Sequence, residues 1–321
     1  MDTPPRQLIL SLFGLYARSE GNWLSVRALI ALMAELGVDS AAVRSSVSRL
    51  KKRGVLESER RDGQAGYALA PSTVELLEAG DTRIWSRPRA TPEDGWLVVV
   101  FSVPESERAR RHALRSLLTR LGFGAASSGV WIAPGTVFDE TLAALERAGL
   151  AAYTEFFRGD YMGVGDVAER IGQWWDLASL ERLYAEFCEE YRGVAPGGRV
   201  ARNENPGGRV ARNENPGGRV ARNESIETPP TACEGRGLDT PPLVPRGGYS
   251  TTGEAAFATY VPMLTAWRRL PYLDPGLPLA YLPQDWPGIE AAQLFTELDA
   301  HLREPAAEYA RSIVGEVASA G

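Results

Sequence analysis

The first 70 residues carry apolar side chains at helical spacing in three segments and then at strand spacing in two. Apolar positions three or four residues apart predict helices over 5–18, 24–37 and 39–54. Two β-prone runs then flank Asp62-Gly63, a pair typical of a tight hairpin turn. A further helix is expected from about residue 72 to 86. Three short helices followed by a hairpin predict a winged helix-turn-helix domain over residues 1–88.

Polar and glycine residues mark the ends of the second and third helices. Ser25 precedes the second helix, and Asp39 or Ser40 precedes the third; their side chains can accept hydrogen bonds from free backbone N–H groups at a helix start. Gly37 and Gly54 follow the last apolar positions and are typical of helix ends.

The pattern changes after residue 94. Apolar runs alternate with amphipathic segments in the order β-α-β-α-β, which predicts a ferredoxin-like α+β domain over 94–162. Helical spacing continues over 163–192, a segment expected to join a C-terminal domain at 251–321 that is mostly helical. The predicted fold class is therefore α+β, with several domains.

Residues 193–250 form a low-complexity segment. The unit GGRVARNENP stands at 197–206 and again, identically, at 207–216, and GGRVARNES follows at 217–225. Each unit offers only Val and Ala as apolar side chains, too few to bury a core, so this segment is predicted to be a disordered insert. The alternative is that its arginines bind phosphate groups without sequence preference.

Charge and composition limit the possible partners. The formal net charge of the 321 residues is −6, yet residues 44–61 hold seven basic side chains against two acidic ones. Salt screens charges over about 8 Å under physiological conditions, so a local basic patch can bind a polyanion despite an acidic remainder. No apolar run approaches the roughly 18 residues of a membrane span, and we expect no membrane partner.

Cysteine and histidine content bears on compartment and chemistry. Two cysteines, Cys188 and Cys233, form no disulfide framework, which favours the cytoplasm. The two histidines, His112 and His301, have no Cys or His at ligand spacing. We therefore expect no metal site, no catalytic triad and no cofactor.

The segment 39–54 would present two different faces as a helix. Val43, Val47 and Leu50 fall on one side, where they can pack against the domain. The opposite side carries short polar and basic side chains, the types that a helix in the major groove of DNA needs. We assign base contacts to Arg44, Ser45 and Ser48, and phosphate contacts to Arg49, Lys51 and Lys52.

The hairpin after this helix would add contacts to the DNA backbone or the neighbouring minor groove. The side chains expected to make them are Arg60, Arg61 and Gln64. The alternative interpretation for the helix and hairpin is an ordinary solvated surface, which any cytoplasmic protein shows.

Three sequence blocks together point to a known family. They are "WLSVRALIALMAELGV" with "VRSSVSRLKKRGVL", "GWLVVVFSVPESERARRHALRSLLTRLGFGAASSGVWIAP", and "RLPYLDPGLPLAYLPQDWPGIEAAQLF". In this order they resemble the PaaX family, the phenylacetic acid catabolon repressors. The signature Val-Arg-x-x-x-Ser-Arg-Leu falls at Val43, Arg44, Ser48, Arg49 and Leu50. The resemblance covers nearly all of the chain except 193–250.

This resemblance implies a dimeric transcriptional repressor of catabolic genes. Its implied partners are double-stranded DNA bearing an inverted-repeat operator and an acyl-CoA effector, such as phenylacetyl-CoA, that releases the protein from DNA. The resemblance supplies no residue that selects one acyl group over another.

Two enzyme classes are weighed as alternatives. The middle domain is similar to the small CRISPR-adaptation endonuclease fold, which places an acidic metal ligand at the end of its first strand. Here that strand ends without an Asp, and Glu105 follows Pro104, so we do not expect metal-dependent nuclease activity. A thioester-processing enzyme would need a nucleophile and a base, and we assign no catalytic residue.

Two groups of residues are candidates for an effector site. Arg108, Arg111 and Arg115 fall near one face of a helix and could bind phosphate or carboxylate groups. Trp174 and Trp267 could line an aromatic acyl pocket. The alternatives are an exposed charged helix face and ordinary core packing, and both stay open here.

Overall fold

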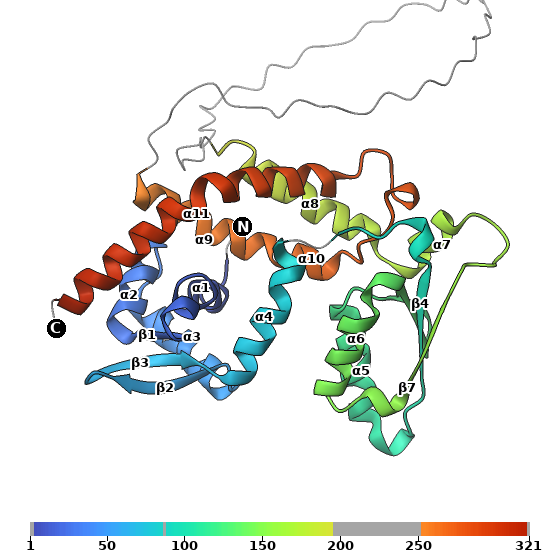
Figure 1. Ribbon diagram of the computed structural model, residues 1–321, viewed down its shortest axis with the longest axis horizontal. Coiled ribbons are helices and arrows are strands. Elements are labelled where there is room, and N and C mark those ends of the chain that lie inside the picture. Colours follow the sequence, from blue (N-terminus) through green and yellow to red (C-terminus); the bar gives the residue numbers. More distant parts are fainter. Residues whose placement is uncertain (1–2, 86–87, 195–251, 320–321) are drawn as a thin grey trace, which may run out of the picture. The chain divides into compact units, whose positions relative to one another are not determined.

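The computed structural model describes residues 3–85, 88–194 and 252–319, which belong to one compact unit. The repeats at 197–225, predicted to be disordered, and Cys233 lie outside the described residues. Figure 1 shows a mixed α+β fold, with helices in every part of the described chain and strands in two sheets. None of the described helices is long and apolar enough to cross a bilayer.

The N-terminal part, residues 3–85, contains four α-helices and a three-stranded antiparallel sheet of order β1-β3-β2. Its elements are α1 (Pro5–Leu12), β1 (Trp23–Ser25), α2 (Val26–Glu35), α3 (Ser40–Lys52), β2 (Leu56–Arg61), β3 (Gln64–Leu69) and α4 (Pro71–Trp85). The first helix does not stay α-helical to residue 18 as predicted. A π-helical turn, Phe13–Ala17, follows α1 and contains Gly14, a weak α-helix former. The short strand β1 was not predicted.

The capping and turn signals are confirmed. Ser25 accepts a hydrogen bond from the Ala28 backbone N–H at 3.1 Å, and Asp39 accepts from the first two residues after Ser40 at 2.8 and 2.9 Å. Asp62 and Gly63, between β2 and β3, have φ values of 49° and 79°. Two consecutive positive φ angles close the two-residue hairpin turn that this pair favours.

The central part is a four-stranded antiparallel sheet with two helices. Its elements are β4 (Trp96–Phe101), α5 (Arg108–Arg120), β5 (Gly124–Ser127), β6 (Val130–Pro134), α6 (Phe138–Arg147) and β7 (Thr154–Gly159). The strand order β5-β6-β4-β7, with α5 and α6 on one face in Figure 1, is that of a ferredoxin-like unit. The apolar run after α5 forms two strands instead of the single predicted one, because the chain turns at Ser128-Gly129.

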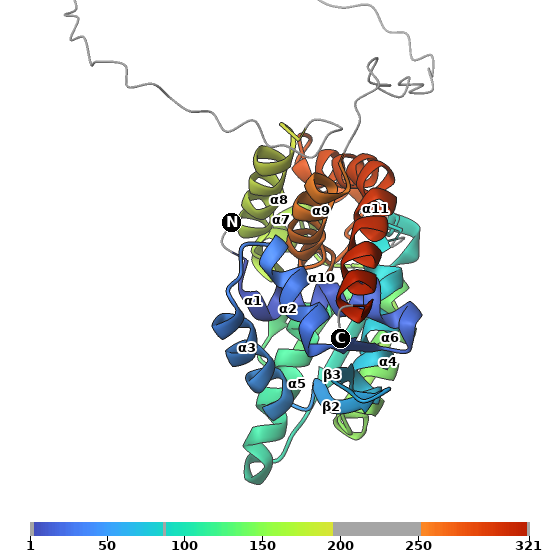
Figure 2. The same cartoon turned by 90° about the vertical axis from the view of Figure 1, so that its left-hand side faces the viewer.

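The C-terminal part is helical. Its elements are α7 (Val167–Trp174), α8 (Leu177–Tyr191), α9 (Gly253–Trp267), α10 (Leu270–Leu273) and α11 (Pro287–Ser319). The segment 163–192 is not one continuous helix: Trp175 is extended, and Asp176 caps α8 through the Ser179 backbone N–H at 3.0 Å. Figure 2 shows α8, α9 and α11 packed together.

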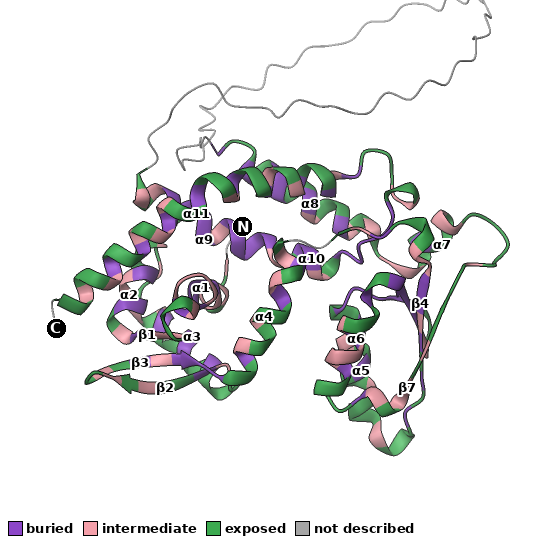
Figure 3. Ribbon diagram, viewed as in Figure 1, coloured by how far each residue is buried: buried purple, intermediate pink, exposed green. Residues whose placement is uncertain are grey.

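One apolar core joins the C-terminal helices to the N-terminal part. Figure 3 shows buried residues along the inner faces of α8, α9 and α11 and around α1 and α2. The side chains of Phe257, Tyr260, Leu29 and Leu32 belong to this single cluster and are all fully buried. Within it, the hydroxyls of Ser11 and Thr265 are hydrogen-bonded at 2.6 Å. Helix α3 therefore packs on α1 and α2, which in turn pack on the C-terminal helices α9 and α11.

Candidate nucleic-acid interface

The helix α3 is held by its apolar side. Val43, Val47 and Leu50 are 2%, 2% and 4% exposed and share a core with α1, which packs directly against α3. Ser46, which was not among the predicted buried positions, is also buried. The apolar side thus fixes the orientation of the opposite one.

The opposite side of α3 faces outward. Every side chain assigned there from the sequence is exposed: Arg44, Ser45, Ser48, Arg49, Lys51 and Lys52. Arg44 and Lys52 form no hydrogen bond or ion pair with the part of the chain that the structure describes. A phosphate or a base edge could bind them without first breaking an internal contact.

Two other side chains of this face have local partners. Arg49 donates to the Ser45 hydroxyl at 3.0 Å and to the Ser45 backbone oxygen at 3.3 Å. The ammonium group of Lys51 lies 5.9 Å from the centre of the Tyr67 ring on β3. Arg49 is thus held against its own helix, whereas Lys51 lies beside the strand β3.

Arg61 is engaged within its own domain. Its Nε donates to Glu59 Oε1 at 2.7 Å, and its Nη2 donates to Glu59 Oε2 at 3.2 Å and to the Gly21 backbone oxygen at 3.0 Å. Its guanidinium also lies over the Trp23 ring. The hydrogen bond from Arg61 lowers the pKa of Glu59, and the hydrogen bond to Glu59 raises the pKa of Arg61. The charge of Arg61 is therefore largely compensated by Glu59.

The other hairpin residues differ from Arg61. Arg60 is exposed and, among the described residues, donates only to the Gly63 backbone oxygen at 2.9 Å, whereas Gln64 is half-buried. A signal for the Arg61–Glu59 pair is present in the sequence, because residues two apart on a strand share one face. Arg53, left out of the predicted contacts, is exposed at the end of α3 and adds a cation with no described side-chain partner.

The residues suggested for an effector site do not line one cavity. Trp174 lines a cavity of about 330 Å³ beside β5 and β6, and Trp267 lines another of about 380 Å³ between α4 and α11. Arg108 and Arg115 are exposed on α5, and Arg111 pairs with Glu105 at 2.8 Å. None of these three arginines lines either cavity.

The end of strand β4 carries no acidic side chain. The strand ends at Phe101, and the next carboxylate along the chain, Glu105, is exposed and paired with Arg111. Among residues 3–85, 88–194 and 252–319, no group of three or more His, Cys, Asp or Glu side chains lies close enough to hold a metal ion.

Three family models match the chain in order. "PaaX-like protein" matches residues 4–73, "PaaX protein central Cas2-like domain" matches 89–171, and "PaaX-like protein C-terminal domain" matches 246–312. The second match agrees with the ferredoxin-like topology of β4 to β7.

Whole-chain comparisons agree with the family matches. The chain is similar to the transcriptional repressor PaaX of Escherichia coli (strain K12), with 22% identity over 293 residues that cover 89% of this chain and 77% of the repressor. Its fold is similar to that of the uncharacterized protein Rv0674 from Mycobacterium tuberculosis, with a TM-score of 0.51 and 17% identity. That likeness covers 96% of this chain and 97% of the other.

Proposed function

The chain belongs to the PaaX family, and from this we propose that it is a DNA-binding transcriptional repressor of phenylacetic acid catabolism. The N-terminal part would act as a winged helix-turn-helix, with α3 as the helix that enters the major groove and the β2-β3 hairpin as the wing. The observation that carries this proposal is the division of α3 into a buried apolar side and an exposed basic side.

The chemistry of the exposed side suits the roles assigned to it. Arg44, with no described partner, can form two parallel hydrogen bonds to the O6 and N7 atoms of guanine. Ser45 and Ser48 are short, so α3 could lie close to the floor of the groove. Lys52 and Arg53, at the end of the helix, are suited to contacts with phosphate groups.

We further propose that the protein acts as a dimer released by an acyl-CoA. Two copies of α3 would enter successive major grooves about 34 Å apart, or a multiple of that spacing, which fits an inverted-repeat operator. Release requires that the effector bind more tightly to the state of the protein that cannot bind DNA than to the state that can. A coupling free energy of about 1–3 kcal/mol between effector binding and DNA binding suffices.

The experiment is a titration of DNA from the protein's own promoter region with the full chain. Binding is measured by fluorescence anisotropy at several salt concentrations. Arg44→Ala should cost about 1–3 kcal/mol and relax specificity at one base position of each half-site. Lys52→Ala should weaken all sequences similarly and reduce the slope of log K against log salt by about 0.9 for each phosphate group that Lys52 neutralises. Arg182→Ala on the exposed side of α8 is the matched control. Operator binding by Arg44→Ala and Lys52→Ala equal to that of the wild type and of the control would contradict the role of α3.

A further inference from the structure

A cavity of about 730 Å³ lies where the N-terminal, central and C-terminal parts meet. Its walls come from α1 and the π-helical turn, from α4, from α5 and α6, and from α9 and α10. Small-molecule sites in proteins commonly measure about 300–1,000 Å³ and often lie between domains. The cavity is therefore large enough for a ligand that touches all three parts of the chain at once.

The apolar side chains around this cavity are incompletely covered. Leu76, Trp85 and Leu273 line it and are 61%, 37% and 42% exposed. They come from α4 and α10, elements that belong to different parts of the chain. Large apolar side chains gathered around a concave surface mark a place where an apolar ligand group would be favourable.

The carboxylates of the cavity are already neutralised. Asp81 pairs with Arg18 at 2.8 Å, and Glu140 pairs with Arg83 at 2.8 Å. Among the described residues, these two are the acidic side chains that line the cavity. Their charges therefore do not repel an anionic ligand strongly.

Basic side chains of the cavity remain without a countercharge. Arg120 and Arg147 are exposed, and within the described ranges neither they nor Arg269 form a side-chain hydrogen bond or ion pair. Arg268 donates to the Gln7 backbone oxygen at 3.1 Å, and burial lowers its pKa to about 10, so its guanidinium stays charged at neutral pH. The cavity thus combines an apolar wall with unpaired cations, which suits an organic anion with an apolar body.

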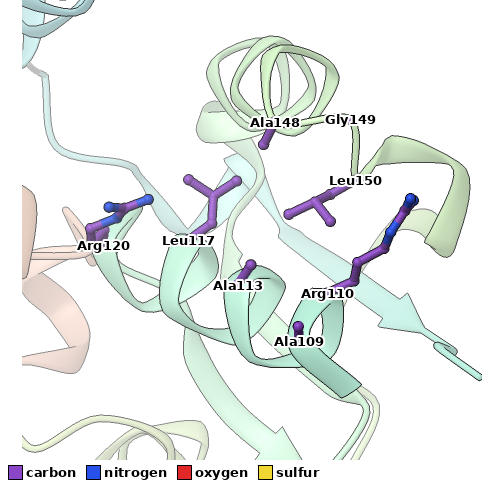
Figure 4. Close-up of a pocket in the computed structure, with 8 residues that line it drawn as sticks. All are labelled: Ala109, Arg110, Ala113, Leu117, Arg120, Ala148, Gly149 and Leu150. Atoms are coloured by element: carbon purple, nitrogen blue, oxygen red, sulfur yellow. The ribbon is translucent and has the colours of Figure 1, made fainter. Parts of the chain in front are cut away.

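A groove continues from this cavity along the central part. Leu117 and Arg120 line both the cavity and a groove of about 510 Å³ between α5 and the end of α6. Figure 4 shows Arg110 and Arg120 at opposite ends of the groove, with Ala113 between them. An elongated anion could place its apolar end in the cavity and extend along this groove.

We propose that this junction cavity is the effector site and that it takes the acyl group of a CoA thioester, with Arg120 and Arg147 binding the phosphate groups. The proposal rests on the repressor function proposed above. It differs from the candidate placement on Arg108, Arg111 and Arg115 that the sequence suggests, because none of those residues lines the cavity or the groove.

The position of the cavity could couple ligand binding to DNA binding. Leu10, Ser11 and Gly14 form its N-terminal wall, and the neighbouring Leu8 and Leu12 of α1 share the core that holds α3. A ligand that moves α1 or α4 relative to the central part would shift the support of α3. The differential affinity that release requires can arise there.

Gly14 allows a direct test. A Cβ built at Gly14 meets nothing within 4 Å, so Gly14→Phe should project into the cavity without displacing the backbone. Gly315→Phe is the matched control, because Gly315 in α11 is also open around its Cβ. Arg120→Ala removes the cation shared by cavity and groove, Arg115→Ala tests the rival helix face, and Arg182→Ala is the control for charge removal.

Calorimetric titration of the full chain with phenylacetyl-CoA, free CoA and phenylacetate measures the binding of the whole ligand, of its CoA moiety and of its acyl group separately. We expect phenylacetyl-CoA to bind. Arg120→Ala should raise its Kd at least about tenfold, as the loss of a charge-assisted hydrogen bond does. Gly14→Phe should raise its Kd by a similar factor, because the ring would occupy the space of the acyl group. Arg115→Ala and both controls should leave Kd unchanged. Binding of free CoA should depend on Arg120 but not on Gly14.

Several results would overturn the proposal. These are no binding of phenylacetyl-CoA by the wild type, equal Kd values for Gly14→Phe and Gly315→Phe, and an effect of Arg115→Ala as large as that of Arg120→Ala. Operator binding by the same proteins without ligand is measured in parallel. Its absence in the wild type would contradict the repressor function itself, whereas normal operator binding with an unaffected Kd in the cavity variants would contradict only the site.

Discussion

Removing the charge of Glu140 should destabilise the protein more than removing the charge of Arg83, although Arg83 is the buried partner of the pair. The Arg83 side chain is 2% exposed and its Nη2 donates to Glu140 Oε2 at 2.8 Å and to the Leu121 backbone oxygen at 3.0 Å. Glu140 is 38% exposed. Water can therefore hydrate the carboxylate if it is left alone, but it cannot reach the guanidinium.

The magnitudes follow from this asymmetry. Glu140→Gln leaves a buried, uncompensated positive charge and should cost about 3 kcal/mol, the lower end for a broken buried pair. Arg83→Met replaces the buried cation by an apolar chain and loses the bond to the Leu121 carbonyl, which should cost about 1 kcal/mol. In the Glu140→Gln background, Arg83→Met should therefore be stabilising by about 2 kcal/mol.

Urea unfolding of the four proteins, followed by tryptophan fluorescence, measures these differences as shifts of the midpoint at constant slope. The reasoning fails if Arg83→Met costs more than Glu140→Gln, or if the two costs simply add in the double variant. Either result would mean that water reaches Arg83 or that Glu140 contributes little to holding its charge.

Three further predictions concern the helix α3 and the hairpin. Leu50→Ala should lower the free energy of unfolding by about 2–5 kcal/mol in urea unfolding, because Leu50 is a buried core residue, and a cost below about 1 kcal/mol would contradict its burial. Asp39→Ala should cost about 0.5–2 kcal/mol by the same measurement, because two backbone N–H groups at the start of α3 lose their acceptor; no change would show that the cap is dispensable. In the folded state the hydrogen bond from Arg61 lowers the pKa of Glu59. The ionised Glu59 therefore stabilises the folded protein fully above the ordinary pKa of 4.5, and this stabilisation is lost as pH falls through the lowered pKa. The difference in unfolding midpoint between wild type and Glu59→Gln should shrink with acidification, and a difference that is constant with pH would refute this.

Local patterns predicted α3 and its surroundings well because each signal acts over a few residues. The caps, the Asp62-Gly63 turn and the burial of Val43 and Val47 depend on spacing and backbone geometry that tertiary contacts reinforce. The β-α-β pattern likewise predicted the ferredoxin-like topology of the central sheet, although it merged β5 and β6 into one strand.

Features that depend on distant pairings were not predictable in the same way. The strand β1 has three residues, too few for a period, and exists because it pairs with β3, where Trp23 lies opposite Ala68. The junction cavity is lined by segments from opposite ends of the chain, as Leu10 and Tyr272 illustrate. A pattern within a few residues cannot predict which distant segments will line the same cavity.

The distribution of charge favours one way of approaching DNA. The chain holds 35 basic and 41 acidic side chains in all, but seven basic and two acidic ones within residues 44–61. The remaining residues therefore hold 28 basic and 39 acidic side chains, so their net charge is negative. Within the basic segment, Arg61 is already paired with Glu59, whereas Arg44 and Lys52 have no described partner. On the proposed function, the attraction to DNA would be strongest at α3, and the negative charge of the remaining residues would help to orient the protein on the duplex.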